Sequence, residues 1–476
     1  MVDDASPAVS DRTTTGAALP FGQTMLYGLG QMAHQVFDSG VGFLALYVFT
    51  ISLGVSPLLV GIAQAISRAI DLFTDPLAGY LADSSRSHRS RLRWLIGAGT
   101  ILGGVSFALI WLFPSGLSRL GYFFWLLICF SFASVGWSFC SIPRQSVGFE
   151  MTRDSHQRAK LMAFASFLAL CCNLVMAWSY KATQLPYFGG TVNGARWVGS
   201  AMGLAIILFG LPFAFFYKLP SSTQPEVLRA ADQSRTAGPK DFLKAIKRVR
   251  KCRSFLLLSG AVAATVIGML GSTFGVCHCI ALYYLCGGSQ QQASNILGAS
   301  SSAWIIAGIL FTAPAVWLAR RIGKKRTFAG AMVLSLLGAG LKWFCYDPAR
   351  LWMFIIPHAL FGIGIGTLAA LVPAMTADVC DVEESISGQR DSGMFSAFYN
   401  WTIKLGISVS IALSGVLLDL SGFTVAQGAA QPPSTILAMR LIDIGFPTAL
   451  FALALALLAG YRVTEQQAAQ ARAALV

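Results

Sequence analysis

Apolar residues in this chain gather in twelve long blocks separated by shorter polar stretches. Each block is close to the roughly 20 residues that a helix needs to cross the hydrocarbon core of a bilayer. Six blocks precede a basic stretch and six follow it. The pattern predicts an all-α membrane protein with twelve transmembrane helices in two six-helix halves. The blocks lie at 22–50, 57–82, 94–113, 121–148, 160–180, 196–217, 255–286, 293–319, 327–346, 352–377, 393–420 and 441–462.

The same pattern divides the chain into five parts. We expect a tail at 1–21, a six-helix bundle at 22–217, a linker at 218–254, a second bundle at 255–462 and a tail at 463–476. The linker is rich in Lys and Arg, and it separates the two halves as a polar, basic segment.

Basic residues in the loops predict the orientation. Four arginines follow the second block between 86 and 93, whereas the loops at 51–56 and 287–292 contain neither Lys nor Arg. Loops that carry Lys and Arg stay in the cytoplasm. Both tails and the linker are therefore predicted to be cytoplasmic. The acidic, polar N-terminus does not resemble a cleavable signal peptide.

Composition supports the membrane assignment. Only 12% of the residues are charged, about half the share in a soluble domain, and 55% are apolar. The net charge of +14 reflects the basic loops, so we expect no nucleic-acid partner. The ten cysteines lie mostly in apolar blocks and lack zinc-like spacing. The expected partners are the lipid bilayer and a small-molecule substrate, and the protein is expected to be a monomer.

Short motifs repeat between the halves. Leu72–Pro76 in the second block matches Leu310–Pro314 in the eighth, and Met151–Asp154 after the fourth matches Met375–Asp378 after the tenth. Both matches pair a block with the one six later. Two halves related by an axis along the membrane normal are typical of the major facilitator fold, with the substrate site between them near the midplane.

Three charged residues lie within the second block. Arg68, Asp71 and Asp75 are spaced i, i+3, i+7 and share one helical face. A charge at the bilayer centre costs about 2.5–3.5 kcal/mol, so such residues are usually functional. Two neighbouring carboxylates repel unless a cation or proton lies between them. The motif predicts a cation site, with charge neutralisation by Arg68 as the structural alternative. The repeat has Ala313 where the second block has Asp75, so the scaffold does not require that acid.

The fourth block contributes hydroxyls and a cation. Ser138, Ser141 and Arg144 recur at every third position, and Pro143 can kink the helix toward a cavity. Arg144 is expected either to bind an anionic substrate group or to pair with an acid of the first or second block.

Further candidates for the substrate pathway lie in the first and eleventh blocks. His34, Gln35 and Asp38 are close along the first helix. Lys404 lies in the middle of the eleventh block, where an ammonium needs a partner, and Asp71 or Asp75 is expected to supply it.

Charged residues at the cytoplasmic ends of helices form another class. Asp83, Arg86, Asp154 and Asp378 are predicted to gate the cavity through salt bridges between the halves, with solvated loops as the alternative. The chain has no phosphate-binding loop, zinc-protease motif or nucleophile elbow, so we expect no enzyme activity. No cofactor is expected beyond a coupling ion, Na⁺ or H⁺.

The chain resembles the glycoside–pentoside–hexuronide:cation symporter family over roughly 21–460. The resemblance is carried by these motifs: Arg68–Pro76, Ile142–Pro143 with the loop at Arg158, Ala377–Asp378 with Gly388–Gly393, Lys404–Gly406 and Ser414–Gly415.

The resemblance implies a symporter with a cation site at Asp71, Asp75 and Ser138, which would bind metal if the ion is Na⁺. Gln35 and Ser141 stand where the family has sugar-binding acids, and Arg144 stands at an aromatic position.

The implied function is uptake of a small polar solute, such as a sugar, a glycoside or an anionic sugar derivative, across a bacterial inner membrane. From the residues themselves, the expected substrate-binding residues are His34, Gln35, Asp38, Arg68, Ser141, Arg144 and Lys404. Alternatives are a carrier of a lysolipid-like amphiphile, a proton-coupled exporter of apolar compounds and a non-transporting receptor.

Overall fold

The computed structural model describes the chain except for 1–18, 84–87, 153–154, 219–251, 388–391 and 475–476, and every regular element in the described part is a helix. The first half contains α1 (Phe21–Ala45) with its π-helical continuation η1 (Leu46–Ser52), α2 (Pro57–Asp83), α3 (His88–Trp111), α4 (Arg119–Glu150), α5 (Ser155–Met176), α6 (Ser179–Thr183), η2 (Pro186–Phe188) and α7 (Thr191–Phe216). The second half contains α10 (Arg253–Leu270), η3 (Thr273–Cys277), η4 (Ile280–Leu285), α11 (Gln290–Ile322), α12 (Lys324–Cys345), η5 (Leu351–Phe354), α13 (Ile355–Ser387), α14 (Ser392–Leu420), η6 (Val425–Gln427), α15 (Pro433–Gly460) and α16 (Glu465–Ala474).

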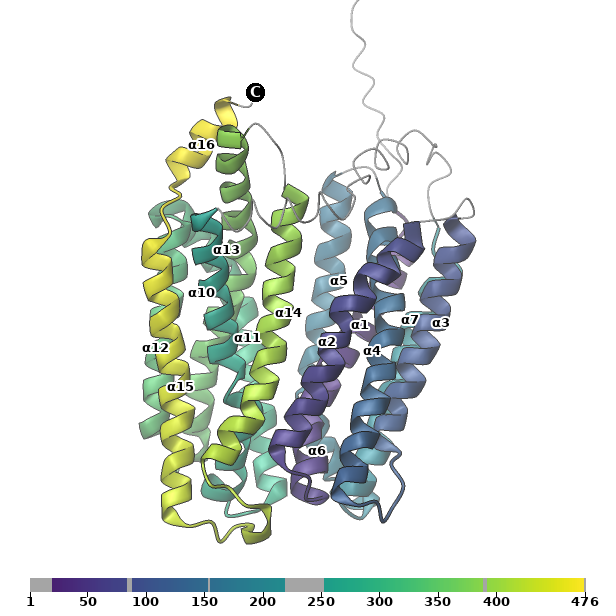
Figure 1. Ribbon diagram of the computed structural model, residues 1–476, viewed down its shortest axis with the longest axis vertical. Coiled ribbons are helices and arrows are strands. Elements are labelled where there is room, and N and C mark those ends of the chain that lie inside the picture. Colours follow the sequence, from purple (N-terminus) through teal and green to yellow (C-terminus); the bar gives the residue numbers. More distant parts are fainter. Residues whose placement is uncertain (1–18, 84–87, 153–154, 219–251, 388–391, 475–476) are drawn as a thin grey trace, which may run out of the picture.

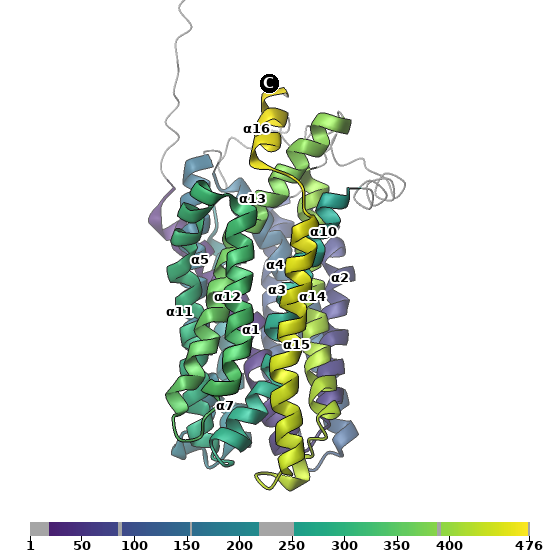
Figure 2. The ribbon, with the colours of Figure 1, turned by 90° about the vertical axis from the view of Figure 1, so that its left-hand side faces the viewer.

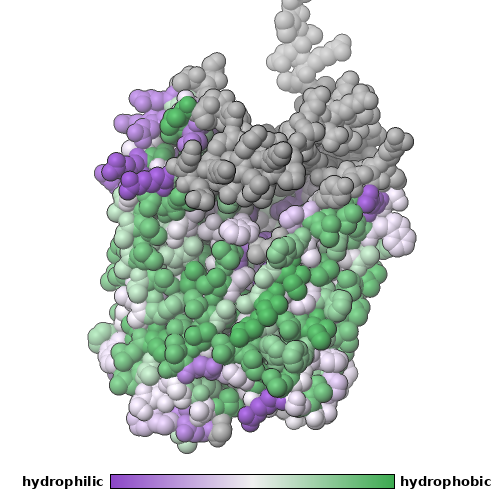
Figure 3. Space-filling model, in the orientation of Figure 1, coloured by the Kyte–Doolittle hydropathy of each residue, from purple (hydrophilic) through white to green (hydrophobic). Residues whose placement is uncertain are grey.

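The helices have the length and surface of membrane spans. Within the described residues, 11 helices are long and apolar enough to cross a bilayer, and α5 adds a shorter apolar stretch at Lys160–Met176. Large apolar side chains such as Leu310 and Phe344 are about 70% exposed around the bundle. Figure 3 shows this apolar surface as a broad band, with hydrophilic residues toward the two ends. The prediction of an all-helical membrane protein is confirmed.

The two halves stand side by side, with α1–α7 in one and α10–α15 in the other (Figures 1 and 2). We call the end of the bundle where α1 begins and α15 ends the linker side, at the top of Figure 1. The opposite end, which carries the loops at 51–56 and 287–292, is the far side. Of the predicted linker at 218–254, the structure describes only residues 218 and 252–254. The rest of the linker lies outside the described residues.

Glycines allow helices of one half to pack closely. A Cβ on Gly136 of α4 would lie 2.4 Å from the backbone nitrogen of Gly103 in α3. Small residues let helix backbones approach in this way where lipid supplies no hydrophobic driving force. This packing fixes the rotation of α4, and therefore which of its side chains face the interior.

The predicted tail at 463–476 contains a further helix, α16. Its first turn is capped reciprocally, because the amide of Gln467 donates to Thr464 Oγ1 and the amide of Thr464 donates to Gln467 Oε1. Ala468 and Ala471 are buried, and Glu465 accepts a hydrogen bond from the amide of Lys324 at 2.9 Å. The tail is thus attached to the second half.

Candidate functional site

A cavity of about 1200 Å³ lies between the halves. Its walls come from α1, α2, α4 and α5 of the first half and from α10, α11, α13 and α14 of the second. The lining extends to Trp317 and Arg320 in the last turns of α11, so the cavity reaches the linker side.

Close contacts between the halves end the cavity at the far side. A Cβ on Gly415 of α14 would lie 2.4 Å from the carbonyl oxygen of Pro57, at the start of α2. A Cβ on Gly61 would lie 3.0 Å from the carbonyl oxygen of Ile411. Trp178, between α5 and α6, donates its indole hydrogen to Ser302 of α11 at 3.0 Å. The structure is therefore a state that is closed at the far side.

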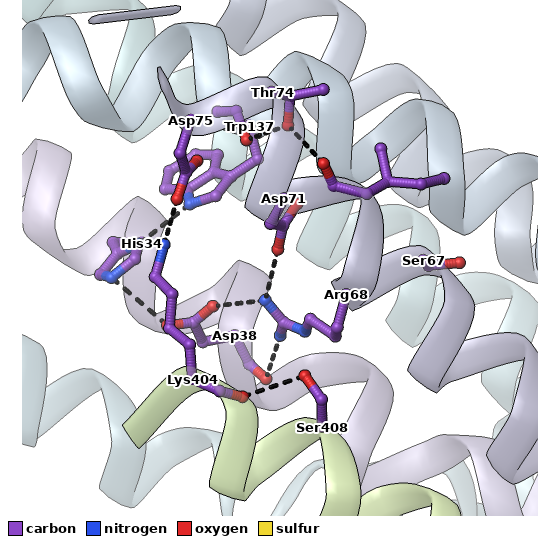
Figure 4. Close-up of polar contacts among 12 residues, drawn as sticks. His34, Asp38, Ser67, Arg68, Asp71, Thr74, Asp75, Trp137, Lys404 and Ser408 are labelled. Atoms are coloured by element: carbon purple, nitrogen blue, oxygen red, sulfur yellow. Dashed lines mark hydrogen bonds and ion pairs between the residues drawn. The ribbon is translucent and has the colours of Figure 1, made fainter. Parts of the chain in front are cut away.

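Arg68 is the centre of the charged cluster in the cavity. Its Nη1 lies 3.1 Å from Asp38 Oδ1 and 3.7 Å from Asp71 Oδ2, so it contacts an acid of α1 and an acid of its own helix (Figure 4). The guanidinium also lies over the rings of Phe37 and Phe130, with 5.4 and 5.5 Å to the ring centroids. Arg68 thus neutralises part of the acidic charge while its own position is fixed by aromatic side chains.

His34 extends this cluster along α1. The indole of Trp137 donates to His34 Nδ1 at 2.9 Å, and His34 Nε2 lies 3.3 Å from Asp38 Oδ2 (Figure 4). Because Nδ1 accepts a hydrogen bond, the arrangement fits the neutral tautomer with its proton on Nε2. Asp38 therefore joins His34 and Arg68 in one hydrogen-bonded chain.

Lys404 connects the halves. Its ammonium forms an ion pair with Asp75, so α14 of the second half is linked to α2 of the first (Figure 4). The expectation that an acid of the second block would serve as its partner is confirmed. The Lys404 side chain is 51% exposed in the cavity. Ion pairs exposed to water contribute about 0–1 kcal/mol, so this contact can be exchanged at little cost.

The predicted cation ligands lie beside this pair. Asp71 and Asp75 both line the cavity, as does Ser138, whose hydroxyl accepts a hydrogen bond from Thr74 at 2.9 Å. The second carboxylate oxygen of Asp71, Oδ1, is buried and has no hydrogen-bond partner among the described residues. A buried carboxylate oxygen without a partner is costly, and a bound cation or a proton would satisfy it. Two carboxylates and a hydroxyl are also the oxygen ligands that a hard cation prefers.

Gln35 belongs to a separate polar chain. Its amide donates to Ser39 at 2.7 Å, and the hydroxyl of Ser39 donates to Asn173 of α5 at 3.1 Å. Gln35, Ser39, Asn173 and Ser141 all line the cavity. Gln35 and Ser141 were predicted from the sequence, whereas Asn173 and Trp137 were not. Asn173 is a polar residue within the apolar fifth block, and that signal would have found it.

Arg144 lies elsewhere than the sequence predicted. It is 3% exposed and is not among the residues that line the cavity. Its Nη2 donates to Gln31 of α1 at 3.0 Å, and its guanidinium lies over the ring of Tyr27 at 5.4 Å. Gly30 makes this position accessible, because a Cβ there would lie 2.7 Å from Arg144 Cδ. The close approach of α1 and α4 thus encloses the Arg144 side chain between the two helices. The side chain does not line the cavity, and its described contacts include no acidic residue.

The predicted gating residues are only partly described. Arg86 and Asp154 lie outside the described residues, and of Asp83 the structure describes only the helix that it ends. Asp378 accepts a bond from Lys324 Nζ at 2.5 Å. Both belong to the second half, so this contact lies within one half, and salt bridges between the halves at the gate stay a prediction. The α11–α12 turn precedes Lys324 directly and brings it to the end of α13.

The two walls of the cavity differ in chemistry. The first half contributes the Arg68 cluster and the polar chain at Gln35. The central wall of the second half is mainly apolar and aromatic. It is formed by Leu270, Phe274, Trp304, Ile305, Ile309, Ile365 and Ile407.

Comparisons with known proteins agree with this architecture. The chain is 22% identical to an isoprimeverose transporter of Lactiplantibacillus pentosus, over 97% of this chain and 92% of the relative. It is 25% identical to a glucuronide carrier protein homolog of Escherichia coli (strain K12), over 93% and 92% of the two chains. Among solved structures, a D-xylose–proton symporter superposes with a TM-score of 0.64 at 15% identity, over 94% of this chain and 98% of that one.

This last likeness shows the fold alone, which is the predicted major facilitator fold. Residues 26–465 match the family described as MFS/sugar transport protein. The match covers all described membrane helices except the first residues of α1. The predicted resemblance to glycoside:cation symporters is confirmed, and so is the expectation of a transporter instead of an enzyme. The chain belongs to the family of MFS/sugar transport proteins.

Proposed function

We propose that the protein is a symporter that couples inward movement of Na⁺ or H⁺ to uptake of a sugar, a glycoside or an anionic sugar derivative by alternating access. It acts as a monomer in a bacterial inner membrane, with both termini in the cytoplasm. The linker side is then the cytoplasmic side, and the state described here is open inward. Its distant relatives include transporters and carriers of isoprimeverose and glucuronides by name.

One observation carries the proposal. In the cavity between the halves, Asp71 has a buried oxygen without a partner in the described part of the chain, while the neighbouring Asp75 is neutralised by Lys404 from the other half. The site thus contains two internal cations, Lys404 at Asp75 and Arg68 at Asp71, together with one acceptor that has no described partner. An incoming cation satisfies Asp71, Asp75 and Ser138 together and releases Lys404.

Coupling follows from the position of Lys404. While Lys404 is paired with Asp75, α14 is tied to α2. A cation at the two aspartates replaces the ammonium, and Lys404 becomes free to contact the substrate. Cation and substrate then favour the same closed state, and each raises the affinity for the other by the same factor.

The polar wall supplies the substrate contacts. His34, Gln35, Asp38, Arg68 and Ser141 offer donors and acceptors on one face of the cavity. Sugars present hydroxyls that such groups bind in pairs, and an aromatic side chain such as Trp304 can pack against the apolar face of a sugar ring. Arg144 is not included, because it is enclosed between α1 and α4.

A second candidate is a carrier of an amphiphile. The observation that favours it is the apolar wall of α11, α13 and α14, together with a cavity of about 1200 Å³. Ligand sites for small molecules usually enclose about 300–1000 Å³, so a substrate longer than a monosaccharide fits the space. An amphiphile would place its polar group at the Arg68 cluster and its chain along Trp304 and Ile305.

Counterflow uptake into proteoliposomes distinguishes the candidates. Vesicles loaded with one compound at a time should exchange radiolabelled sugars, glycosides or uronates if the symporter proposal is right. Exchange of lysolipids alone would favour the amphiphile carrier. Imposed Na⁺ and pH gradients, applied separately, identify the coupling ion through the gradient that drives accumulation. Accumulation of no tested solute under either gradient would contradict cation symport.

A further inference from the structure

A fully buried ion pair lies in the second half, behind the apolar wall of the cavity. Lys342 Nζ of α12 lies 3.0 Å from both carboxylate oxygens of Asp443 in α15, and both side chains are 0% exposed. The hydroxyl of Tyr346, one turn after Lys342, donates to Asp443 Oδ2 at 2.6 Å. None of these residues was predicted as a site residue. The two charges lie about a hundred residues apart in the sequence, and only the fold brings them together.

A buried ion pair needs a reason beyond stability. The desolvation of two charges commonly equals or exceeds their attraction, so apolar side chains of similar volume often serve stability as well or better. Here the ammonium donates to both carboxylate oxygens of Asp443 and to its backbone oxygen at 3.3 Å. The arrangement fixes the relative position of α12 and α15, and it fixes the hydroxyl of Tyr346.

Tyr346 carries this constraint to the cavity wall. Cys277 Sγ lies 3.5 Å from the Tyr346 hydroxyl and 3.5 Å from His358 Nε2 of α13. His358 is oriented in turn by a 2.8 Å bond between its Nδ1 and the carbonyl of Phe354. Because that carbonyl is an acceptor, Nδ1 carries the proton and Nε2 is an acceptor. The Tyr346 hydroxyl donates its one hydrogen to Asp443, so the thiol of Cys277 is the donor toward either the Tyr346 oxygen or His358 Nε2.

Cys277 is the last residue of η3, a π-helical turn. Its amide bonds to the carbonyl of Ser272 at 3.0 Å, five residues earlier, where an α-helix would bond four residues earlier. The turn places Thr273 and Phe274, and the next residue His278, at the cavity. Single π-turns inside helices frequently occur at functional sites.

The same turn meets the first half at the far side. Phe274 packs edge to face against Phe43 of α1, with 6.4 Å between ring centroids. His278 stacks on Tyr47 of η1 at 5.4 Å. The first helix of each half is thus followed by a π-helical segment, and His278, directly after η3, contacts Tyr47 of η1 where the cavity ends.

We propose that Lys342, Asp443 and Tyr346 are positioning residues that hold η3 through Cys277, so that Phe274 and His278 close the far side of the cavity. The chain of contacts runs from a buried charge pair to a thiol, and from the thiol to the turn that carries both closing side chains. The expected effect of these residues on transport rests on the proposed alternating-access function. The position of η3 can be tested without that function.

Hydrogen exchange of the full-length protein in lipid nanodiscs tests the placement. Tyr346→Phe removes the hydroxyl and keeps the ring. We expect amide exchange at 273–278 and at 43–50 to rise about three- to tenfold, the effect of losing one hydrogen bond. Tyr122→Phe is the matched control, because the structure describes no hydrogen bond for that hydroxyl, and it should leave both segments unchanged. Wild-type exchange of both segments in Tyr346→Phe would overturn the inference.

A second variant separates positioning from folding. Lys342→Met with Asp443→Leu removes both charges and leaves no buried charge unpaired, so it should fold even if single substitutions do not. It should speed exchange of the same two segments while α3 and α7 retain wild-type exchange. A uniform rise across both halves, or no rise at η3, would overturn the inference.

Transport gives the third readout. With a loosened far side, downhill flux persists while the ratio of accumulation to downhill flux falls about three- to tenfold. A mere loss of folded protein lowers both fluxes together and leaves the ratio unchanged. Faster exchange confined to the two segments supports the positioning role whatever the fluxes do. If that exchange is accompanied by an unchanged ratio, the proposed alternating-access function is contradicted instead.

Discussion

The ammonium of Lys404 on α14 forms an ion pair with the carboxylate of Asp75 on α2, and this contact joins the two halves inside the cavity. Half of the Lys404 side chain is exposed there. The pair is therefore weak enough to be exchanged during transport, in contrast to the fully buried pair of Lys342 and Asp443. The exposed pair lies between the halves, and the buried pair lies within one of them.

The first prediction concerns coupling. Asp71→Asn and Asp75→Asn should each abolish gradient-driven accumulation, because a neutral amide cannot hold a cation or a proton in the same way. One coupled charge at 100 mV corresponds to about 2.3 kcal/mol, or roughly fiftyfold accumulation, and this is what should be lost. Uptake and exchange into proteoliposomes provide the measurement.

Exchange without a gradient should survive in part, since the amide imitates the occupied site. Asp347→Asn is the control, because this carboxylate lies in a far-side loop and caps the amide of Ala349. Wild-type accumulation by both α2 variants would show that helix 2 does not hold the coupling site.

The second prediction concerns Arg144. The guanidinium has one described hydrogen bond, to Gln31, while its Nε and Nη1 are buried without hydrogen-bond partners among the described residues. Arg144→Met should therefore leave thermal stability within about 1 kcal/mol of wild type or raise it, because a poorly compensated buried charge is removed. The KM for substrate should change less than twofold, in line with the ordinary effect of a residue outside a site.

Arg68→Met serves as the comparison, since Arg68 lies in the cavity and contacts Asp38 and Asp71. It should impair substrate uptake strongly. Thermal unfolding in detergent and uptake kinetics measure both variants. An Arg144 variant that binds substrate tenfold more weakly but unfolds normally would refute the assignment of Arg144 to a packing role.

The third prediction concerns closure of the far side. Gly415→Ala introduces a Cβ that would lie 2.4 Å from the backbone oxygen of Pro57 in the opposite half. Overpacking of this kind costs about 1–3 kcal/mol, so the far-side-closed state should lose population and uptake should slow. Gly340→Ala in α12 is the matched control, because a Cβ there meets nothing within 4 Å. Equal uptake rates for the two variants would argue against this contact as the closure.

The fourth prediction concerns topology. A cysteine introduced at residue 88 or 324 should react with a membrane-impermeant maleimide only from the cytoplasmic side, because the basic loops are retained there. A cysteine at Ala430, in the loop between α14 and α15, should react only from outside. Labelling of residue 88 or 324 from outside in intact cells would reverse the proposed orientation.

The sequence by itself determined the elements and the family. Blocks of about 20 apolar residues can satisfy their backbone hydrogen bonds in lipid only as helices. The number and order of the helices therefore follow from the pattern of apolar blocks along the chain. Charges within such blocks are rare and costly, which is why Asp71, Asp75 and Lys404 could be predicted as candidate site residues. The helical period also placed Arg68, Asp71 and Asp75 on one face, and the structure finds all three at the cavity.

Tertiary packing decided which helix each face meets. Arg144 follows Ser141 by three residues, yet Ser141 lines the cavity and Arg144 is enclosed by α1, because Gly30 allows the two helices to approach. Lys342 and Asp443 looked like single residues in two apolar blocks, and only the contact of α12 with α15 makes them a pair. The period of a helix fixes directions around its own axis. The partners in those directions depend on rotations and distances set by glycines, prolines and aromatic side chains throughout the bundle, which no single stretch of sequence contains.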